Sequence, residues 1–549
     1  MVRGLAVLAA GLLAAKVAAA PADIVLSGGP IYTADDAHPT AQAVAVAGGR
    51  IVFVGDAAGA KGLIGPSTQT IDLKGASLFP GFTDAHAHLD GIGRRELTFN
   101  LEGSKSAAEV TARLKARTAH AKPGEIIIGR GWIETGWPEK RFLERQDLDA
   151  VSKANPVLMG RSDGHAIVAN SLALQKAGIT DDTKAPFGGA ILRDDKGHIT
   201  GMLVDNAMSL VEPLIAKASD EARELELRTG MLVENRYGWT GVHFMSAPWE
   251  DVLILEKLAA TGEAPLRIYA AVDRQDAAKL MQSGPRSAAD GRITTRAIKL
   301  YADGALGSRG AALFEPYSDA HDNFGLLRLV PEDTLPLLRQ AAAKGLQVCT
   351  HAIGDRANAL ALDLYAQALP EAGPDPRWRI EHAQHIRPAD IKRFAKLGVI
   401  ASMQPSHAIG DLHFAPTRLG QERLEGAYAW KSLMESGAVV AGGSDAPVER
   451  GDPLIEFYAA VARKDLEGNA GEGWHLEQAL TRKEALKLFT VNAAFARFAE
   501  KELGSIEVGK RADLTAFSVN LMTAPEEKIP LGHAVLTMVD GKVVYQLEK

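Results

Sequence analysis

The sequence predicts an α/β fold: a (β/α)8 TIM barrel with a small β-sandwich domain formed by both termini and a large insertion after the first barrel strand. Three observations lead to this prediction. Apolar strand-like runs alternate with helical patterns through the middle of the chain, short β-strand patterns occupy both ends, and two histidines follow the first long apolar run. The 549 residues suffice for one barrel with additions, or for two or three domains.

The barrel is predicted from eight apolar runs that remain once one insertion is set aside. Helical stretches such as 331–344 and 389–397 lie between them, as the crossovers between parallel strands require. We assign residues 79–93 to the first barrel strand and its exit, and 236–504 to the rest of the barrel. The predicted strands cover residues 79–84, 241–245, 266–272, 297–301, 346–351, 378–382, 399–404 and 438–443.

Both ends of the chain read as short β-strands joined by glycine turns. Neither end has enough strands to bury a core alone, so we expect residues 23–78 and 505–549 to pair into one β-sandwich domain. The strand patterns cover residues 23–27, 42–46 and 50–54 at one end, and 512–517, 534–539 and 542–545 at the other.

Residues 94–235 separate the first two predicted barrel strands and are numerous enough to form a domain. Insertions on the strand-to-helix side of a barrel lie over the active-site mouth, so we expect a lid or a substrate wall. The loop 131–137 contains two tryptophans, Trp132 and Trp137. These two side chains are expected either to line the pocket or to form the core of the insertion.

The N-terminus resembles a secretory signal peptide, residues 1–22. Arg3 supplies a positive charge, residues 5–15 form an apolar run too short to span a bilayer, and small residues follow near Ala20. Lys16 interrupts the run and Pro21 disfavours cleavage directly after Ala20, so the cut site stays open. We expect a periplasmic or secreted protein; an uncleaved tail is the alternative.

The composition is that of an ordinary soluble globular protein, with 46% hydrophobic residues, 23% charged residues and a net charge of −7. The mild acidity argues against nucleic acid as a partner and against an anionic membrane surface once the signal is removed. The single cysteine, Cys349, excludes an intrachain disulfide. A small-molecule substrate is the expected partner, and the oligomeric state is left open, with a homodimer as one option.

Polar residues gather at the ends of the predicted barrel strands. Histidines at i and i+2 on a strand point to one face, and the carboxyl ends of barrel strands are where catalytic residues lie. Singly, each has a plainer explanation, such as a rim histidine, a core histidine or an aspartate capping a turn. A lysine within an apolar strand is harder to explain, because a buried unpaired ammonium is costly. The candidate metal ligands are His86, His88, Lys299, His351, His382 and Asp445.

This set of side chains fits a divalent metal centre. Four imidazoles and a carboxylate suit zinc or a similar ion. A neutral lysine nitrogen can take up CO2 as a carbamate, whose two oxygens would bridge a pair of metal ions about 3.5 to 4 Å apart and sharing a water. Asp445 would then act as general acid and base, accepting the proton of the attacking water and passing it to the leaving nitrogen.

Six segments resemble motifs of the amidohydrolase superfamily, and within it the YtcJ-like metal-dependent hydrolases with an amidohydrolase 3 domain. The resemblance covers nearly the whole chain from residue 22 and extends into the C-terminal β-domain through 503–505 and 509–513. It implies a binuclear metal hydrolase of amide or related C–N bonds, with Lys299 as the carboxylated bridge. The matching segments are 79–88, 299–309, 350–355, 380–384, 403–407 and 442–448.

The expected activity is hydrolysis of an amide, N-acyl or N-formyl bond in a small molecule. A metal-dependent lyase or isomerase, an ester hydrolase, and a non-catalytic scaffold on the same barrel are the alternatives, because fold does not fix reaction. Asp303 either shares the face of Lys299 or fixes the glycine turn that follows. The candidate substrate-binding residues, each also open to a structural role, are His165, Arg309, His385, His407 and Trp137.

Overall fold

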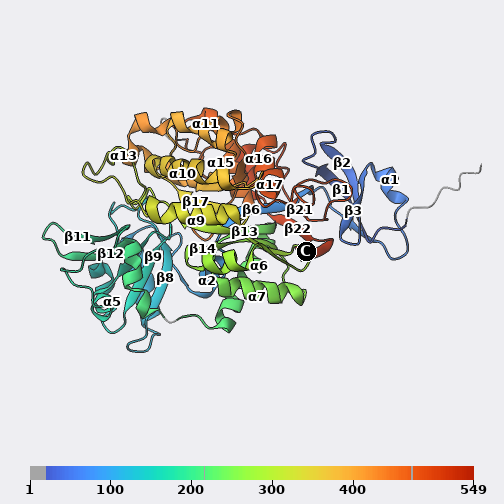
Figure 1. The fold of residues 1–549 in the computed structure, drawn as a ribbon. Helices are drawn as coiled ribbons and strands as arrows, with labels where there is room; N and C mark the ends of the chain where they lie inside the picture. Colours follow the sequence, from blue (N-terminus) through green and yellow to red (C-terminus); the bar gives the residue numbers. More distant parts are fainter. Residues whose placement is uncertain (1–19, 216, 471–473, 549) are drawn as a thin grey trace, which may run out of the picture.

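A nearly closed parallel sheet forms the centre of the molecule (Figure 1). The computed structural model describes residues 20–215, 217–470 and 474–548. Every pairing between successive barrel strands is parallel, in the order β20-β19-β18-β17-β16-β14-β13-β6. The barrel strands are β6 (Phe82–Ala87), β13 (Trp239–Ala247), β14 (Arg267–Asp273), β16 (Ile293–Tyr301), β17 (Gln347–Ala352), β18 (Arg379–His382), β19 (Ile400–Met403) and β20 (Val440–Gly442).

The first and last barrel strands meet at the carboxyl end of the sheet. The backbone N–H of Ser444 donates to Asp84 Oδ1 at 2.9 Å, and that of Asp445 donates to the carbonyl oxygen of His86 at 2.6 Å. These bonds hold the loop after β20 against β6. The eight predicted strands thus correspond to the eight observed ones, and the barrel part of the predicted fold is confirmed.

Helices surround the barrel and connect its strands (Figure 1). The helix α6 illustrates how their ends are fixed. The Ser219 side chain caps its first turn by accepting a hydrogen bond from the backbone N–H of Ala222, and Gly238, at φ 108°, ends the helix in a left-handed conformation. The helices of this part are α2 (Leu89–Leu97), α6 (Asp220–Tyr237), α7 (Trp249–Ala260), α8 (Ala277–Ser283), α9 (Pro331–Ala343), α10 (Asp355–Ala368), α11 (Pro388–Leu397), α12 (Pro405–Asp411), α13 (Ala415–Leu419), α14 (Trp430–Glu435), α15 (Pro453–Ala462), α16 (Arg482–Leu488) and α17 (Val491–Ala496).

The two ends of the chain form one eight-stranded sheet at one side of the barrel (Figure 1). β21 from the C-terminal segment pairs antiparallel with β5, which directly precedes the barrel. The helix α1 (Ala57–Lys61) lies on the N-terminal part. The strands are β1 (Ile24–Tyr32), β2 (Thr40–Ala47), β3 (Arg50–Gly55), β4 (Gln69–Asp72), β5 (Ser77–Pro80), β21 (Leu514–Phe517), β22 (Ala534–Val539) and β23 (Lys542–Gln546).

The hydrogen-bonding order of this sheet is continuous, β23-β22-β21-β5-β1-β2-β3, with β4 beside β1. Its division into the two facing layers of a sandwich stays a prediction. The expected first barrel run, 79–84, is divided between two sheets: Phe79 and Pro80 belong to β5, and the barrel strand begins at Phe82. Gly81 lies between them, where a Cβ atom would come within 2.3 Å of Thr240 Oγ1.

Aromatic side chains join the terminal sheet to the barrel. Phe82 packs on Phe517 at 5.2 Å between ring centroids, on Phe489 at 5.9 Å and on Trp239 at 6.2 Å, and all four are buried. Burying each such ring contributes about 1.5–3 kcal/mol. The terminal sheet is therefore packed against the barrel core.

The insertion forms a six-stranded sheet in the order β11-β12-β10-β9-β8-β7. Trp132 and Trp137 are buried in its core, where the indole N–H of Trp137 donates to Ser104 O at 2.7 Å. Packing within the insertion therefore uses this side chain, which agrees with the core alternative, and its part in the substrate pocket stays a prediction. The elements are β7 (Phe99–Asn100), α3 (Ala107–Thr118), β8 (Ile127–Trp132), α4 (Arg145–Asp149), β9 (Val157–Arg161), β10 (Ala166–Ala169), α5 (Ser171–Lys176), β11 (Gly189–Arg193) and β12 (Ile199–Asp205).

Most of the predicted signal peptide lies outside the part of the chain that the structure describes, which begins at residue 20. Among the described residues, no helix has both the length and the apolar character needed to cross a membrane.

Candidate metal centre

The six predicted ligands lie together at the carboxyl ends of the barrel strands. His86 is near the end of β6, and His88 follows it at the start of α2. His351 and His382 are near the ends of β17 and β18, and Asp445 follows β20. His382 and Asp445 have φ angles of 69° and 60°, a left-handed conformation that is costly for residues with a Cβ atom and is often found at functional sites.

Asp445 lies between two histidine pairs. Its Oδ1 atom is 3.4 Å from His86 Nε2 and 3.2 Å from His88 Nε2. On its other side, the Oδ2 atom is 3.5 Å from His407 Nε2 and 4.0 Å from His382 Nδ1. Two groups with metal-ligand geometry therefore share this carboxylate: His86, His88 and Asp445, and His382, His407 and Asp445.

Lys299 and His351 complete the cluster. Lys299 is 1% exposed, and its Nζ atom lies 3.3 Å from His86 Nε2 and 4.9 Å from the centroid of the Tyr301 ring. Within the described ranges, no carboxylate forms an ion pair with this lysine. The ring of His351 packs on that of His382 with centroids 4.5 Å apart. The structure thus brings all six predicted residues together.

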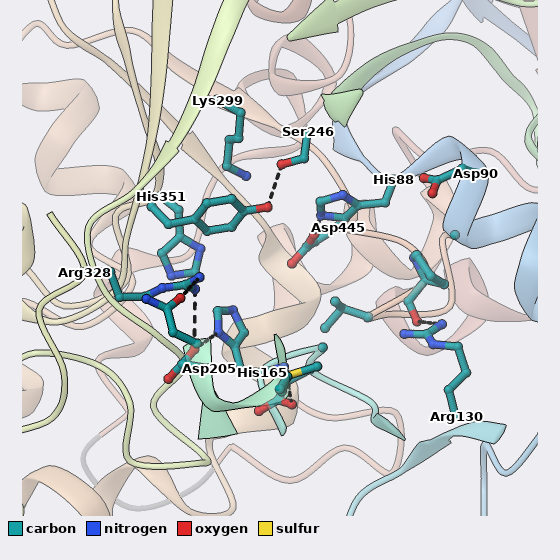
Figure 2. A pocket seen from close by; sticks show the side chains of 18 of the residues that line it. His88, Asp90, Arg130, His165, Asp205, Ser246, Lys299, Arg328, His351 and Asp445 are labelled. Carbon is teal, nitrogen blue, oxygen red and sulfur yellow. Dashed lines mark hydrogen bonds and ion pairs between the residues drawn. The ribbon is translucent and has the colours of Figure 1, made fainter. Parts of the chain in front are cut away.

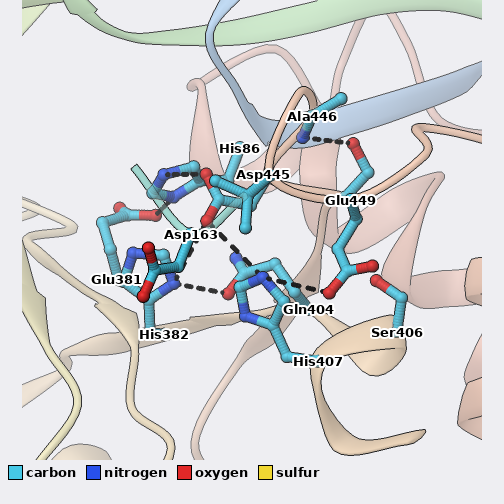
Figure 3. Close-up of polar contacts among 12 residues, drawn as sticks. His86, Asp163, Glu381, His382, Gln404, Ser406, His407, Asp445, Ala446 and Glu449 are labelled. Carbon is cyan, nitrogen blue, oxygen red and sulfur yellow. Dashed lines mark hydrogen bonds and ion pairs between the residues drawn. The ribbon is translucent and has the colours of Figure 1, made fainter. Parts of the chain in front are cut away.

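Hydrogen bonds to neighbouring acceptors fix the orientation of the histidine rings. His86 Nδ1 is 2.6 Å from Glu381 Oε2, and His382 Nδ1 is 2.8 Å from Gln404 Oε1 (Figure 3). His88 Nδ1 is 3.1 Å from the carbonyl oxygen of Met245. Each acceptor requires the hydrogen on Nδ1, which leaves a lone pair on Nε2. Such outer partners are typical of metal-binding histidines.

These tautomers make the cluster suited to a cation. The Nε2 lone pairs of His86 and His88 point at Asp445 Oδ1, and that oxygen has no hydrogen-bond donor. Of these three acceptors, His86 Nε2 and Asp445 Oδ1 are buried, His88 Nε2 is partly exposed, and the Lys299 amine, 3.3 Å from His86 Nε2, brings a hydrogen to His86 alone. A divalent cation relieves the electrostatic repulsion that remains between the acceptors. The residues present therefore fit a metal centre.

Burial controls the charge states around the cluster. It lowers the pKa values of His86, His351 and His382 well below the usual range, with help from neighbouring cationic groups, so these imidazoles are neutral, as metal binding requires. Burial opposes ionisation of Asp445, but a positive charge on the side of His86 and His88, carried by a proton or by a metal ion in its place, brings the pKa of Asp445 below the ordinary value. An ionised carboxylate and neutral imidazoles are the forms that bind a divalent ion.

Asp303 stabilises the backbone around the site. It accepts hydrogen bonds from the backbone N–H groups of Ala312, Ile353 and Gly354 at 2.8 to 3.0 Å. Burial raises its pKa to about 7, and these three bonds act in the opposite direction. Its carboxylate therefore ties the loop after β16 to the end of β17, which agrees with the turn-fixing alternative.

Two cavities open on the cluster. The first, the Tyr301 cavity, has a volume of about 530 Å³ and is lined by Tyr301, Arg328 and His165 among others. In it, Tyr301 Oη lies 2.5 Å from Ser246 Oγ, and the Arg328 guanidinium lies over the Tyr301 ring (Figure 2). The second, the Glu449 cavity, has a volume of about 930 Å³ and lies on the side of His407 and Glu449. His351, His382 and Asp445 line both.

The predicted substrate-binding residues divide into two sets. His165 lines both cavities, is held by Asp205 at 2.6 Å and packs on His351; His407 lines the Glu449 cavity. Arg309 instead pairs with Asp319 at 2.8 Å and lines a separate cavity of about 680 Å³ together with Trp137. None of the six candidate ligands lines that cavity.

His385 is also placed away from the cluster. It is 3% exposed and lines a small cavity of about 150 Å³ that none of the six candidate ligands lines. Arg309, His385 and Trp137 thus line cavities other than the two that open on the cluster, and their part in substrate binding stays a prediction. A position at the end of a barrel strand predicts where a side chain lies, whereas a position in a loop does not.

Sequence reasoning missed several residues that the structure places at the site. Glu381, next to His382, orients His86, and Tyr301, two residues after Lys299, lines the cavity on the same strand. Their adjacency to predicted ligands was a usable signal. Asp205, which holds His165, carried no such signal because it comes from the end of the insertion sheet.

The fold and the site together define a class: a barrel enzyme with a candidate metal centre at the carboxyl ends of its strands. The family model described as amidohydrolase family matches residues 69–545. This chain belongs to the amidohydrolase family.

Relatives and solved structures are similar to this chain over almost its whole length. The putative amidohydrolase YtcJ of Bacillus subtilis is 34% identical over 531 residues, covering 94% of this chain and 98% of that protein. The N-substituted formamide deformylase of Arthrobacter pascens is 28% identical over 95% of this chain and 98% of its own length. The crystal structure of an uncharacterized metal-dependent hydrolase from Pyrococcus horikoshii superposes with a TM-score of 0.74 at 29% identity, covering 92% of this chain and 99% of that one.

Proposed function

We propose that this protein hydrolyses a carbon–nitrogen bond, in an amide, N-acyl or N-formyl group of a small molecule. The observation that carries the proposal is the position of Asp445, which faces the His86 and His88 lone pairs on one side, faces His407 on the other and lines both cavities. The formamide deformylase relative acts, by its name, on an N-substituted formamide, which supports a C–N bond as the target.

Asp445 is proposed to move one proton during the reaction. It would accept a proton from the water that adds to the substrate carbonyl and deliver it to the nitrogen as the C–N bond breaks, so that water and amide become a carboxylic acid and an amine. Its buried position, facing both cavities, supports a role that needs contact with the attacking water and with the leaving group.

A divalent metal, proposed to be a pair of zinc ions, would be held by His86, His88, His351, His382, Asp445 and carboxylated Lys299. When bound, it lowers the pKa of a coordinated water and polarises the substrate carbonyl. The lysine supports this proposal because its amine is 1% exposed and faces His86, so a carbamate would replace a costly buried ammonium with a ligand.

His407 is proposed to position the substrate. Gln384 Nε2 donates to His407 Nδ1 at 2.8 Å, which places the remaining ring hydrogen on Nε2. That nitrogen is buried and has no hydrogen-bond partner. It is therefore free to donate to an oxygen of the substrate on the side of the Glu449 cavity.

A panel of N-acyl amino acids, formamides, cyclic amides and esters tests the reaction type with metal-loaded protein. We expect an amine and a carboxylate as products, with one oxygen from labelled water in the carboxylate. Faster turnover of esters than of amides would favour an ester hydrolase, and turnover without water incorporation would favour the lyase or isomerase alternative.

The change Lys299→Ala tests the proposed bridge. We expect the loss of at least one metal equivalent and of most activity, with partial recovery when a short carboxylic acid is added, because it can occupy the space of the carbamate. Intact-mass measurement of the native protein under mild conditions should show the added carboxyl group. A fully active native enzyme with unmodified Lys299 and a single metal would refute the binuclear proposal.

The cellular setting is part of the same proposal. The N-terminal pattern supports export to the periplasm or beyond the cell, and the mild acidity supports a free small-molecule substrate rather than nucleic acid or membrane. Fractionation of cells expressing the full chain, with N-terminal sequencing of the exported form, tests export and locates the cut.

A further inference from the structure

The wall of the Glu449 cavity carries carboxylates without basic partners. Glu449 follows β20, and its carboxylate contacts His407, with Oε1 3.7 Å from Nε2 (Figure 3). Within the described ranges, no lysine or arginine forms an ion pair with it. Burial raises the pKa of Glu449 to about 8, and Asp411, Asp445 and Glu102 add to this effect, since all are acidic.

Asp411, at the end of α12, is the second such carboxylate. It accepts a hydrogen bond from the hydroxyl of Tyr428 and forms no ion pair with a lysine or arginine in the part of the chain described. Two arginines of this cavity are engaged elsewhere: Arg161 pairs with Glu134 and Asp163, and Arg95 donates to the carbonyl oxygens of residues 449 and 450. The other basic residues that line it, Lys105, Arg236 and Arg450, form no ion pair with either carboxylate in the described part of the chain. The acidic wall therefore lacks a countercharge.

A second observation points to a ligand in the same place. His407 is 6% exposed, and its Nε2 atom, which carries the hydrogen, has no hydrogen-bond partner although it faces the cavity. The same atom lies 3.5 Å from Asp445 Oδ2 and 3.7 Å from Glu449 Oε1. The acidic wall is thus separated from the predicted reaction centre by one imidazole, so a short substrate can reach both.

We propose that the Glu449 cavity binds a positively charged group of the substrate, so that the preferred substrate is an amide bearing an ammonium or guanidinium group a short distance from the scissile bond. This inference rests on the proposed function and specifies its substrate class. The bound cation lies against Glu449 and Asp411, His407 Nε2 donates to an oxygen of the same molecule, and the C–N bond lies at Asp445. The cation supplies the countercharge that these partly buried carboxylates lack.

Matched pairs of substrates test the proposal: mono-N-acetyl derivatives of short diamines against N-acetyl alkylamines of equal length, at a pH just above 8 so that Glu449 is ionised. We expect kcat/KM to favour the charged member by about tenfold or more, because the ion pair forms in a partly desolvated site. In Glu449→Gln the preference should fall to about one. Glu212→Gln, which removes an exposed carboxylate from the Tyr301 cavity, is the matched control and should keep the preference.

Calorimetric binding of the free diamine gives a readout that does not depend on turnover. We expect binding to the metal-loaded protein that weakens about tenfold in Glu449→Gln and is unchanged in Glu212→Gln. If amides are hydrolysed without regard to charge, or if Glu449→Gln keeps the preference, the cation site is refuted while the hydrolase stands. If the diamine binds through Glu449 but no amide is hydrolysed, the proposed function fails and the cation site stands.

Discussion

The orientation of His86 depends on one buried acidic side chain, Glu381. Changing Glu381 to glutamine removes its negative charge while keeping the shape of the side chain. Glu381 is fully buried, its Oε2 atom lies 2.6 Å from His86 Nδ1, and its Oε1 atom lies 2.7 Å from Arg379 Nε. The Glu381→Gln amide keeps an oxygen for His86 but leaves Arg379 without a countercharge. Arg379 is itself fully buried, so solvent cannot replace the lost charge.

Two magnitudes follow from this geometry. Removing one partner of a buried ion pair costs about 3–5 kcal/mol of folding free energy. Weakening the outer partner of a metal-binding histidine lowers metal affinity about 10–100-fold. We therefore expect Glu381→Gln to unfold at lower denaturant concentration and to lose metal at a lower chelator concentration than the native protein.

Denaturant unfolding of metal-free protein and chelator titration of metal-loaded protein measure the two effects separately. Glu109→Gln on α3 is the control, because Glu109 pairs with Arg113 at 2.6 Å on the surface, where water and salt screen the charges. Unchanged stability together with unchanged metal retention in Glu381→Gln would show that neither the ion pair nor the orientation of His86 matters as argued.

The remaining predictions concern the insertion, the termini and pH. Trp137→Ala should destabilise the protein by about 3–5 kcal/mol because it leaves a cavity in the core of the insertion. His165→Asn should change KM and kcat while the metal content is retained. Equal loss of metal in both variants would contradict this expectation. Deletion of residues 512–549 removes β21 to β23 and should lower the melting temperature of the whole protein, and an unchanged value would count against the shared sheet. Burial raises the pKa of Asp411 from 3.8 to about 7, so the folded state binds the extra proton and stability should fall as pH rises between these values; Asp411→Asn should flatten that slope, and an unchanged slope would contradict it.

Much of the site could be predicted because barrel strands present their ends at one rim. His86, His351 and His382 are each near the end of an apolar run, and parallel pairing brings such ends together whatever their separation in sequence. Lys299 was predicted for a related reason: a charge within an apolar strand requires a compensating role. These inferences need only strand order and the cost of burial.

Loop and insertion residues could not be placed in this way. Arg309 ends one of the informative motifs and Trp137 lies in the insertion loop, yet the ion pair with Asp319 and packing within the insertion direct these two side chains away from the centre. The role of Glu449 follows only from the cavity that it lines, since a cavity is formed by segments far apart in the chain.

The sequence by itself determined the barrel, the pairing of the two termini and the six candidate ligands, because hydrophobic periodicity and residue chemistry are local properties. The tertiary structure alone decided which nitrogen of each histidine is free, which side chains face each cavity and which carboxylates lack a countercharge. Those properties depend on distances between segments such as Glu381 and His86, or Glu449 and His407, which lie on different strands and loops. Electrostatic interactions act through space, so only the folded arrangement fixes them.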